Sequence, residues 1–223
     1  MIKNFSLKEP VDIYQVENTF YLKSHPTRIN KLLAHYELYK SITHLPGCVI
    51  ECGVYKGASL SRFATFRNVL ENDFSRKVIG FDAYGDFPLD NIGSTDDKDF
   101  IAKFENAGGN GISKEELEFI FAEKRFQNIS LVKGNVFETV PEYLEKNKHT
   151  KIALLHLDLD VYEPTKFCIE AFLPHMIKGG IIVFDDYNSV EGATRAADEL
   201  CKYTNQGLEK LPFYEVPAFY KIA

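Results

Sequence analysis

Five short apolar runs recur along the chain, and each ends in or beside a small or acidic residue. Segments with helical spacing of apolar residues separate these runs. Strands that are covered by helices on both faces are apolar along their whole length, because neither face meets water. We therefore predict an α/β fold with an open, doubly wound and mostly parallel sheet. The predicted strands cover residues 48–52, 78–82, 129–132, 152–158 and 181–185.

Two segments outside these runs indicate further elements. Residues 27–45 place apolar side chains at mostly helical spacing and stop at Pro46 and Gly47, which predicts a helix packed on the edge of the sheet. Residues 213–222 alternate aromatic and β-branched side chains around Pro217, which indicates two extended pieces. An antiparallel hairpin at one edge of the sheet would fit this pattern.

Residues 85–111 interrupt the alternation of strands and helices with Pro88, several aspartates and a glycine-rich end. Open α/β sheets bind ligands at the carboxyl ends of their strands, so a long loop at this position indicates a lid that covers a bound ligand rather than an idle insertion. Ser113 and Glu116 then have the spacing of a capping box and begin a helix that runs to about residue 124. We predict one domain over residues 1–223, with this lid and an N-terminal helical segment to about residue 46.

Charge and composition argue against several classes of protein. The formal net charge is -6, and no run of lysines and arginines would neutralise a phosphate backbone, so we expect no nucleic-acid partner. No stretch approaches the roughly 18 apolar residues of a membrane span, and the first residues lack the apolar core of a signal peptide. The four cysteines lack metal-site spacing and are typical of reduced thiols. These observations predict a cytoplasmic protein that does not act at a membrane.

The first predicted strand runs into a turn that contains Gly53 and Gly57. Their G-x-x-x-G spacing matches neither the dinucleotide fingerprint nor the phosphate-binding loop, and glycines occur in many such turns for structural reasons. Asp82 ends the next strand, where a carboxylate can accept hydrogen bonds from both ribose hydroxyls; a helix cap is the structural alternative. After the third strand, Gly134 and Asn135 offer a turn against which an adenine could lie, although a simple strand-end turn would explain them too.

A cluster of acidic residues is expected where the fourth and fifth strands end. Asp158 ends the fourth strand with Asp160 close behind it, and Asp185 and Asp186 follow the fifth strand. Like charges a few ångströms apart resist ionising together, so we expect a positive charge among them. Oxygen-only ligands suit Mg²⁺ or Mn²⁺, although each aspartate alone could also be a strand-end cap or turn residue. We interpret His156, which lies within the apolar run, as a core or supporting residue.

The stretches that carry these sites resemble the macrocin O-methyltransferase family of metal-dependent sugar O-methyltransferases. The resemblance spans nearly the whole predicted sheet in family order, and the last two stretches are its most specific part. The matching stretches are ECGVYKGAS at 51–59, GFDAYGDFP at 80–88, KGNVFETVP at 133–141, ALLHLDLDVYEPTK at 153–166 and KGGIIVFDDYNSVEGATRAADEL at 178–200.

This resemblance implies a Rossmann-like methyltransferase sheet that binds S-adenosylmethionine and a divalent metal. It implies that Asp160 is the general base, and that the metal is held by Asp158, Asp185 and Asp186. A more distant resemblance to catechol O-methyltransferase supports these metal ligands, although that enzyme uses a lysine as its base. The residues expected to contact the cofactor are Glu51, Gly53, Tyr55, Ser59, Asp82, Gly134, Asn135 and Asp158.

We expect the acceptor to be a sugar or polyol hydroxyl, in a nucleotide-linked sugar, a glycan or a glycosylated natural product. Catechol methylation is the alternative among enzymes of this class. An NAD-dependent oxidoreductase would lack its dinucleotide fingerprint, and a non-catalytic cofactor-binding protein would have no reason to keep four mutually repelling acids. The aromatic side chains of Phe20, Tyr21, Tyr36 and Tyr39 could cover the surface of a homodimer or a higher homo-oligomer.

Overall fold

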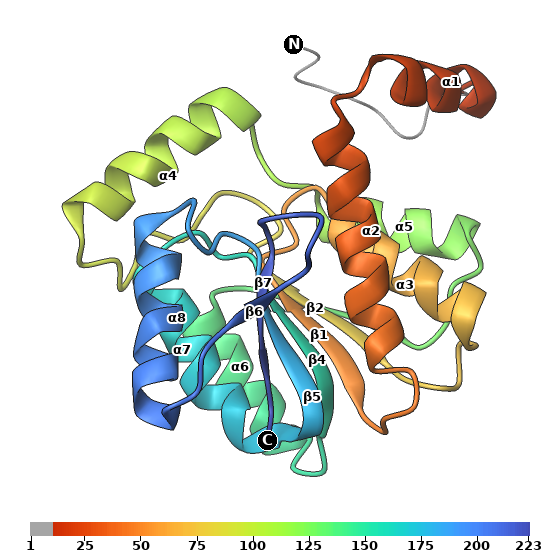
Figure 1. The fold of residues 1–223 in the computed structure, drawn as a ribbon. Coiled ribbons are helices and arrows are strands. Elements are labelled where there is room, and N and C mark those ends of the chain that lie inside the picture. Colours follow the sequence, from red (N-terminus) through yellow and green to blue (C-terminus); the bar gives the residue numbers. More distant parts are fainter. Residues whose placement is uncertain (1–10) are drawn as a thin grey trace.

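A computed structural model describes residues 11–223 of the chain as a seven-stranded sheet between two layers of helices (Figure 1). The strand order is β3-β2-β1-β4-β5-β7-β6; the first five strands are parallel, and β7 and β6 pair antiparallel at one edge. This confirms the predicted fold class. The strands are β1 Cys48–Cys52, β2 Val78–Asp82, β3 Ile129–Lys133, β4 Ile152–Leu157, β5 Met176–Phe184, β6 Glu209–Lys210 and β7 Ala218–Lys221.

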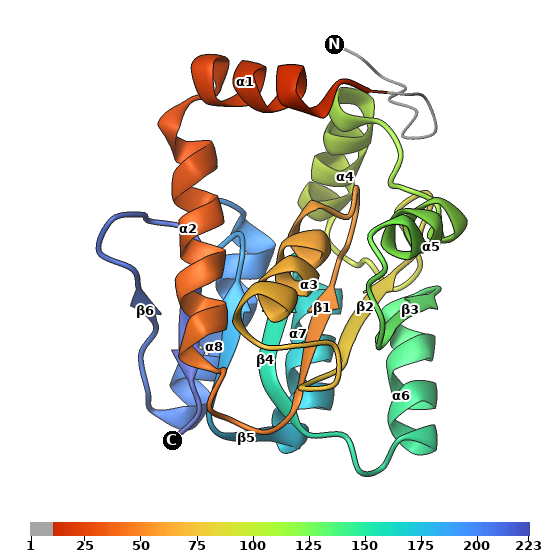
Figure 2. The ribbon, with the colours of Figure 1, turned by 90° about the vertical axis from the view of Figure 1, so that its right-hand side faces the viewer.

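The helices divide between the two faces of the sheet, as Figure 2 shows. On one face α2, α3 and α5 pack against the strands, and on the other face α6, α7 and α8 do so. Adjacent residues of β1 illustrate why the runs are apolar throughout, because Val49 belongs to one core and Ile50 to the other. The helices are α1 Ile13–Lys23, α2 Pro26–Ser41, α3 Ala58–Leu70, α4 Thr95–Gly108, α5 Lys114–Glu123, α6 Val136–Lys146, α7 Tyr162–Phe172 and α8 Glu191–Thr204, with a 3₁₀ turn at Leu173–His175.

Helix α2 corresponds to the predicted helix over residues 27–45, but it does not lie on the sheet edge. The imidazole ring of His35 in α2 lies 5.2 Å from that of His156 in β4, so the helix covers the face of the sheet beside α3. Tyr39 is also wrong as a residue of a dimer surface. It is fully buried, and its hydroxyl donates a hydrogen bond to Glu71 at 2.6 Å.

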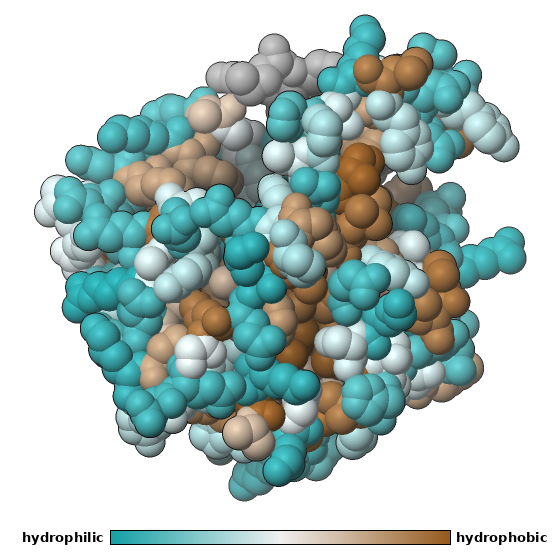
Figure 3. All heavy atoms as spheres, viewed as in Figure 1, coloured by the Kyte–Doolittle hydropathy of each residue, from teal (hydrophilic) through white to brown (hydrophobic). Residues whose placement is uncertain are grey.

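Helix α1 stands away from the body and buries none of its residues (Figure 1). Its exposed apolar side chains include Ile13, Tyr14 and Leu22, and Figure 3 shows apolar surface on this helix and along α2. No helix within residues 11–223 is long and apolar enough to cross a membrane. The predicted N-terminal segment to residue 46 begins with residues 1–10, which lie outside the described part of the chain.

The expected hairpin near the C-terminus forms with a different partner. Only Ala218–Lys221 of the predicted segment is a strand; its partner β6 precedes that segment at Glu209–Lys210. Pro217 lacks the N–H group that a strand donates, which fits its place just outside β7. Strand β5 also begins five residues earlier than its apolar run, at Met176 rather than residue 181.

The predicted lid contains a helix of its own. Within residues 85–111, Ser94 caps α4 by accepting a hydrogen bond from the Asp97 backbone N–H, and Asp96 and Asp97 lie in the first turn. Acidic residues are favourable there because the N-terminus of a helix carries partial positive charge. Ser113 caps α5 as the sequence predicted. Two of the aspartates in the segment that we predicted as a long loop therefore lie in the first turn of a helix.

Candidate active site

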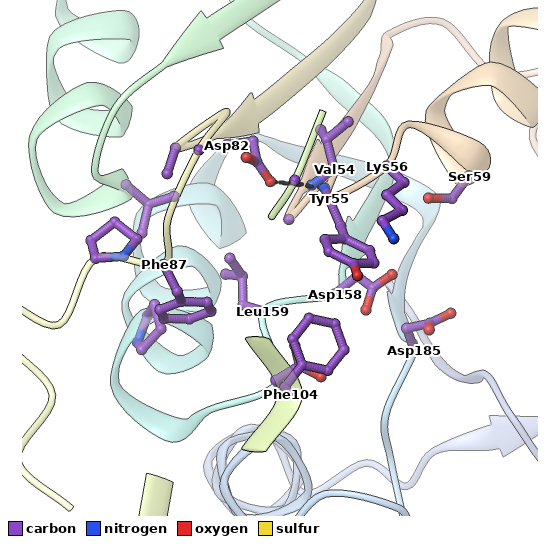
Figure 4. A pocket seen from close by; sticks show the side chains of 18 of the residues that line it. Val54, Tyr55, Lys56, Ser59, Asp82, Phe87, Phe104, Asp158, Leu159 and Asp185 are labelled. Carbon is purple, nitrogen blue, oxygen red and sulfur yellow. Dashed lines mark hydrogen bonds between the residues drawn. The ribbon is translucent and has the colours of Figure 1, made fainter. Parts of the chain in front are cut away.

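A cavity of about 540 Å³ opens at the carboxyl edge of the parallel strands. Its walls come from the β1–α3 turn, the ends of β2, β4 and β5, the β3–α6 turn, the lid and the helices α2 and α3. Every residue that the sequence analysis assigned to the site lines this cavity except Glu51. Figure 4 shows Tyr55, Asp82, Asp158 and Asp185 around it. The tertiary structure thus brings the two predicted sites together into one cavity.

Gly53 allows two strand ends to approach each other closely. Its φ is +87°, and a Cβ added there would lie 1.8 Å from the carbonyl oxygen of Asp158. The Asp158 N–H donates to the carbonyl oxygen of Cys52 at 2.9 Å. The glycine therefore joins the turn after β1 to the residue after β4, so that the predicted cofactor and metal residues share one wall.

Asp82 holds the glycine turn in place. One of its oxygens accepts hydrogen bonds from the backbone N–H groups of Val54 and Tyr55, at 2.7 and 3.0 Å, and the other accepts from Tyr84 N–H at 2.5 Å (Figure 4). The carboxylate still lines the cavity, beside the turn that contains Gly134. The structural role of Asp82 is therefore to clamp a turn, and the helix cap that we considered is not formed.

The structure argues against the expected contact between Glu51 and the cofactor. Its side chain is fully buried, and its Oε1 lies 2.9 Å from Nδ1 of His156. Burial raises the pKa of Glu51, while the hydrogen bond with His156 and the charge of that imidazole act in the opposite direction. Glu51 thus has no exposed surface with which to contact a cofactor, and its carboxylate instead holds the imidazole of His156 in place within the core.

Three carboxylates meet at the ends of β4 and β5. One oxygen each from Asp158, Asp185 and Asp186 lie within 4.8 Å of one another. Burial raises the pKa of Asp158, and the charges of Asp185 and Asp186 raise it further. Burial and the charge of Asp185 likewise raise the pKa of Asp186 to about 6, and its Oδ2 is buried with no hydrogen-bond partner in the described chain. Such a set of oxygens fits a hard divalent cation.

Positive charge reaches this cluster from residues that the sequence did not indicate. Lys31 extends from α2 and donates a hydrogen bond to Oδ2 of Asp185 at 2.5 Å. His156 lies 3.3 Å from the other oxygen, Oδ1, and His35 lies 3.6 Å from it. Burial alone would raise the pKa of Asp185, but the hydrogen bond with His156 and the charge of Lys31 outweigh burial and lower it. Burial alone would lower the pKa of His156, but hydrogen bonds with Asp185 and Glu51 raise it to about 10, so Lys31 and His156 both bring positive charge to Asp185. Within residues 11–223, Asp158 and Asp186 form no ion pair of their own.

Asp160 lines the cavity beside the three clustered carboxylates, in a left-handed backbone conformation with φ +62°. Its carbonyl oxygen accepts a hydrogen bond from Ala193 N–H, which fixes this conformation against α8. Burial, followed by the charges of Asp186 and Asp185, raises the pKa of Asp160 to about 7. A carboxylate with a pKa close to neutral can accept a proton efficiently near physiological pH.

Residues of the lid line the cavity together with Tyr55 and Lys56 of the β1–α3 turn. Tyr55 binds the lid and the residue that follows it: its hydroxyl donates to the carbonyl oxygen of Gly109 at 3.3 Å, and its own carbonyl oxygen accepts from Ile112 N–H at 2.7 Å. The ring of Phe104 in α4 lies 5.0 Å from the ring of Tyr55 (Figure 4). Lys56 donates to the carbonyl oxygen of Gly108 at 2.6 Å. Residues of the predicted lid thus form one wall of the cavity.

Comparisons with known proteins agree with this geometry. A family model described as macrocin-O-methyltransferase (TylF) matches residues 27–211. No curated protein sequence matches the chain. The crystal structure of CalS11, described as a calicheamicin methyltransferase, is 29% identical with a TM-score of 0.70, over 96% of this chain and 87% of CalS11. The O-methyltransferase NovP is 20% identical with a TM-score of 0.74, over 87% of this chain and 80% of NovP, which shows a shared fold.

The family match includes the glycine turn, the lid and both carboxylate-bearing strand ends, all of which contribute to the one cavity. Because it covers most of the chain, the protein belongs to the macrocin-O-methyltransferase (TylF) family and is an S-adenosylmethionine-dependent methyltransferase.

Proposed function

We propose that this protein transfers a methyl group from S-adenosylmethionine to a hydroxyl group of a sugar, with a Mg²⁺ or Mn²⁺ ion held by Asp158, Asp185 and Asp186. The observation that carries the proposal is the meeting of these carboxylates within 4.8 Å in the wall of the cavity, beside Asp160. A second structure of CalS11 describes it as TDP-rhamnose 3′-O-methyltransferase, which supports a sugar as the acceptor class.

The proposed cofactor lies across the strand ends. Gly134 and Asn135 line the cavity where the adenine would bind, and Asp82 lines it where the ribose hydroxyls would bind. Tyr55 and Ser59 then line the part that would hold the methionine end. This order would bring the reactive sulfonium near Asp158, beside the carboxylate cluster. The lid excludes water from the same space, which favours the alignment of the two reactants.

The reaction is an in-line displacement at the methyl carbon. The acceptor oxygen forms a bond to this carbon while the bond to sulfur breaks, and the electron pair of that bond stays on sulfur, which becomes a neutral thioether. Asp160 accepts the proton of the hydroxyl on its carboxylate. A divalent cation at the aspartate cluster would supply Lewis-acid chemistry, which lowers the pKa of a sugar hydroxyl far enough for a carboxylate to act as its base.

Metal titrations combined with turnover test this proposal. Asp158→Asn should weaken Mn²⁺ binding, measured by electron paramagnetic resonance, because no sulfur or nitrogen ligand can replace the lost oxygen. Asp160→Asn should lower kcat by about 100-fold or more while Mn²⁺ affinity stays nearly unchanged. Asp99→Asn, an exposed change in α4 outside the cavity, is the matched control and should alter neither quantity.

Two results would contradict the proposal. Full turnover of every accepted sugar in the presence of EDTA would exclude the metal, and normal turnover by Asp160→Asn would exclude that base. Mass spectrometry of candidate sugars incubated with isotopically labelled cofactor and Mg²⁺ identifies the acceptor, and a catechol methylated in their place would favour the alternative acceptor.

Self-association is also part of the proposal. No residue of α1 is buried by the rest of residues 11–223, and a second copy of the chain would cover its apolar side chains. Light scattering of the purified protein should show a homodimer or a higher homo-oligomer. A monomer over the whole accessible concentration range would contradict this expectation.

A further inference from the structure

Four cationic side chains line the cavity, and two of them have partners. Lys31 binds Asp185, and Lys56 binds the carbonyl oxygen of Gly108. Arg28 and Arg62 also line the cavity, but neither guanidinium makes a hydrogen bond or ion pair with any residue between 11 and 223. The described chain therefore leaves two guanidinium groups free to interact with a ligand.

The two arginines come from helices that pack against each other. Arg28 lies in α2, three residues before Lys31, and this spacing places both side chains on the same face of the helix. Arg62 lies in α3, three residues after Ser59, whose hydroxyl group also lines the cavity (Figure 4). Arg28 is exposed and Arg62 is partly buried. The pair thus lies at the end of the cavity formed by α2 and α3, away from Gly134.

Electrostatics make this pair unfavourable without a counterion. Burial lowers the pKa of Arg62, and the charge of Arg28 lowers it further, so the two cations repel each other. The nearby carboxylate of Asp185 is already engaged by Lys31. A guanidinium group presents its N–H donors in a planar fork that matches the oxygens of a carboxylate or a phosphate. An anion bound between the two side chains would remove their repulsion and satisfy their donors.

We propose that Arg28 and Arg62 form an anion-binding subsite for a carboxylate or phosphate group carried by one of the two substrates. This inference rests on the proposed function, which supplies two sources of such a group. The first is the carboxylate of the methionine part of the cofactor, which would extend past Ser59 towards α2 and α3. The second is the diphosphate of a nucleotide-linked sugar, which would bind at the end of the cavity that these two helices line.

Calorimetry with three probes distinguishes the two sources. S-adenosylhomocysteine carries the carboxylate, 5′-methylthioadenosine lacks it, and inorganic pyrophosphate represents the phosphate source. EDTA is present throughout, so that pyrophosphate cannot bind through a metal ion. The variants are Arg28→Gln and Arg62→Gln. The matched control is Arg125→Gln, which removes the same charge from an exposed position outside the cavity.

If the cofactor carboxylate binds the pair, both variants should lose about 10- to 100-fold in affinity for S-adenosylhomocysteine and none for 5′-methylthioadenosine, as expected for lost hydrogen bonds to a charged group. If the phosphate of the acceptor binds there, S-adenosylhomocysteine affinity should stay unchanged, and the unmodified protein should bind pyrophosphate at least tenfold more tightly than either variant. Either pattern supports the subsite and identifies its ligand. Arg125→Gln should match the unmodified protein with all three probes.

Equal affinities of the unmodified protein and both variants for every probe would overturn the subsite. Arg28 is exposed, so Arg28→Gln decides the question even if Arg62→Gln unfolds, and thermal unfolding identifies that case. Arg62→Lys, which keeps the charge but not the planar fork, should recover only part of the affinity. Failure of the proposed function is a separate result: in that case no sugar is methylated in a metal-dependent reaction, although the arginines still bind the carboxylate.

Discussion

Replacing Gly53 by alanine tests whether this glycine serves the junction of two strands rather than the cofactor alone. The added Cβ would lie 1.8 Å from the carbonyl oxygen of Asp158, far inside van der Waals contact, and 2.6 Å from the carbonyl carbon. Both atoms belong to the backbone, so no side-chain rotation can relieve the overlap. The turn after β1 must therefore move away from the end of β4.

The cost has two parts. A left-handed backbone, here with φ +87°, costs a non-glycine residue about 1–2 kcal/mol. Separating the strand ends strains or breaks the hydrogen bond from Asp158 N–H to Cys52, and a buried backbone group without its partner costs about 1–3 kcal/mol. We expect Gly53→Ala to lower the free energy of unfolding by about 2–5 kcal/mol, a large part of the stability of a typical domain.

Urea denaturation measures this loss, and two other glycines serve as controls. Gly179 also has a positive φ of +81°, but a Cβ there would meet only ordinary contacts at 3.6 Å, so Gly179→Ala should show the backbone cost alone. Gly207→Ala, where nothing lies within 4 Å, should change stability by less than about 0.5 kcal/mol. If Gly53→Ala costs no more than Gly179→Ala, the close approach to Asp158 does not restrict this position, and our reasoning about the junction is wrong.

Three further predictions follow from the site. Asp82→Asn should weaken S-adenosylhomocysteine binding and lower the free energy of unfolding by about 1–3 kcal/mol, because an amide cannot accept hydrogen bonds from all three backbone N–H groups. Unchanged affinity in calorimetry and unchanged stability in urea denaturation would refute both roles of Asp82. Hydrogen exchange in residues 85–111 should be fast in the free protein and slower with cofactor and acceptor bound, and full protection without ligands would show a fixed wall rather than a lid. Burial lowers the pKa of His35 to about 4 in the folded protein, whereas its pKa in the unfolded chain is about 6.5. As the pH falls below about 6.5, the unfolded chain therefore binds a proton at His35 that the folded protein does not yet bind, and this favours unfolding. From pH 7.5 to 5 the protein should lose about 2 kcal/mol of stability through this group, and His35→Phe should remove that part of the loss in urea denaturation.

Local patterns were sufficient to predict the sheet and its functional edge. A buried parallel strand is apolar on both faces, and this property can be read from consecutive residues such as those of β1 and β4. Parallel strands also end at the same edge, so acids that follow β4 and β5 in the sequence must lie near one another. This is why Asp158, Asp185 and Asp186 were predicted together, and they do meet within 4.8 Å.

The partners that other elements bring to the site could not be predicted. Lys31, Arg28 and Arg62 reach the cavity from α2 and α3, and the position of a helix on a sheet face depends on side-chain packing over long sequence separations. Nothing in the residues around Lys31 indicates that its ammonium group lies on Asp185, 154 positions further along the chain. Helical periodicity identified the helix but not the face of the sheet that it covers.

The sequence by itself determined which residues end the strands, because strand ends depend on nearby apolar runs. Only the tertiary structure decided what each of those residues contacts. Glu51 follows Ile50 in the strand, yet its side chain is buried against His156 rather than exposed to the cavity. Gly53 was expected to contact the cofactor, and the group that approaches it most closely is the Asp158 carbonyl. In both cases the deciding contact comes from β4 or the residue that follows it, more than 100 residues away in the chain, and such distant contacts form only when the sheet assembles.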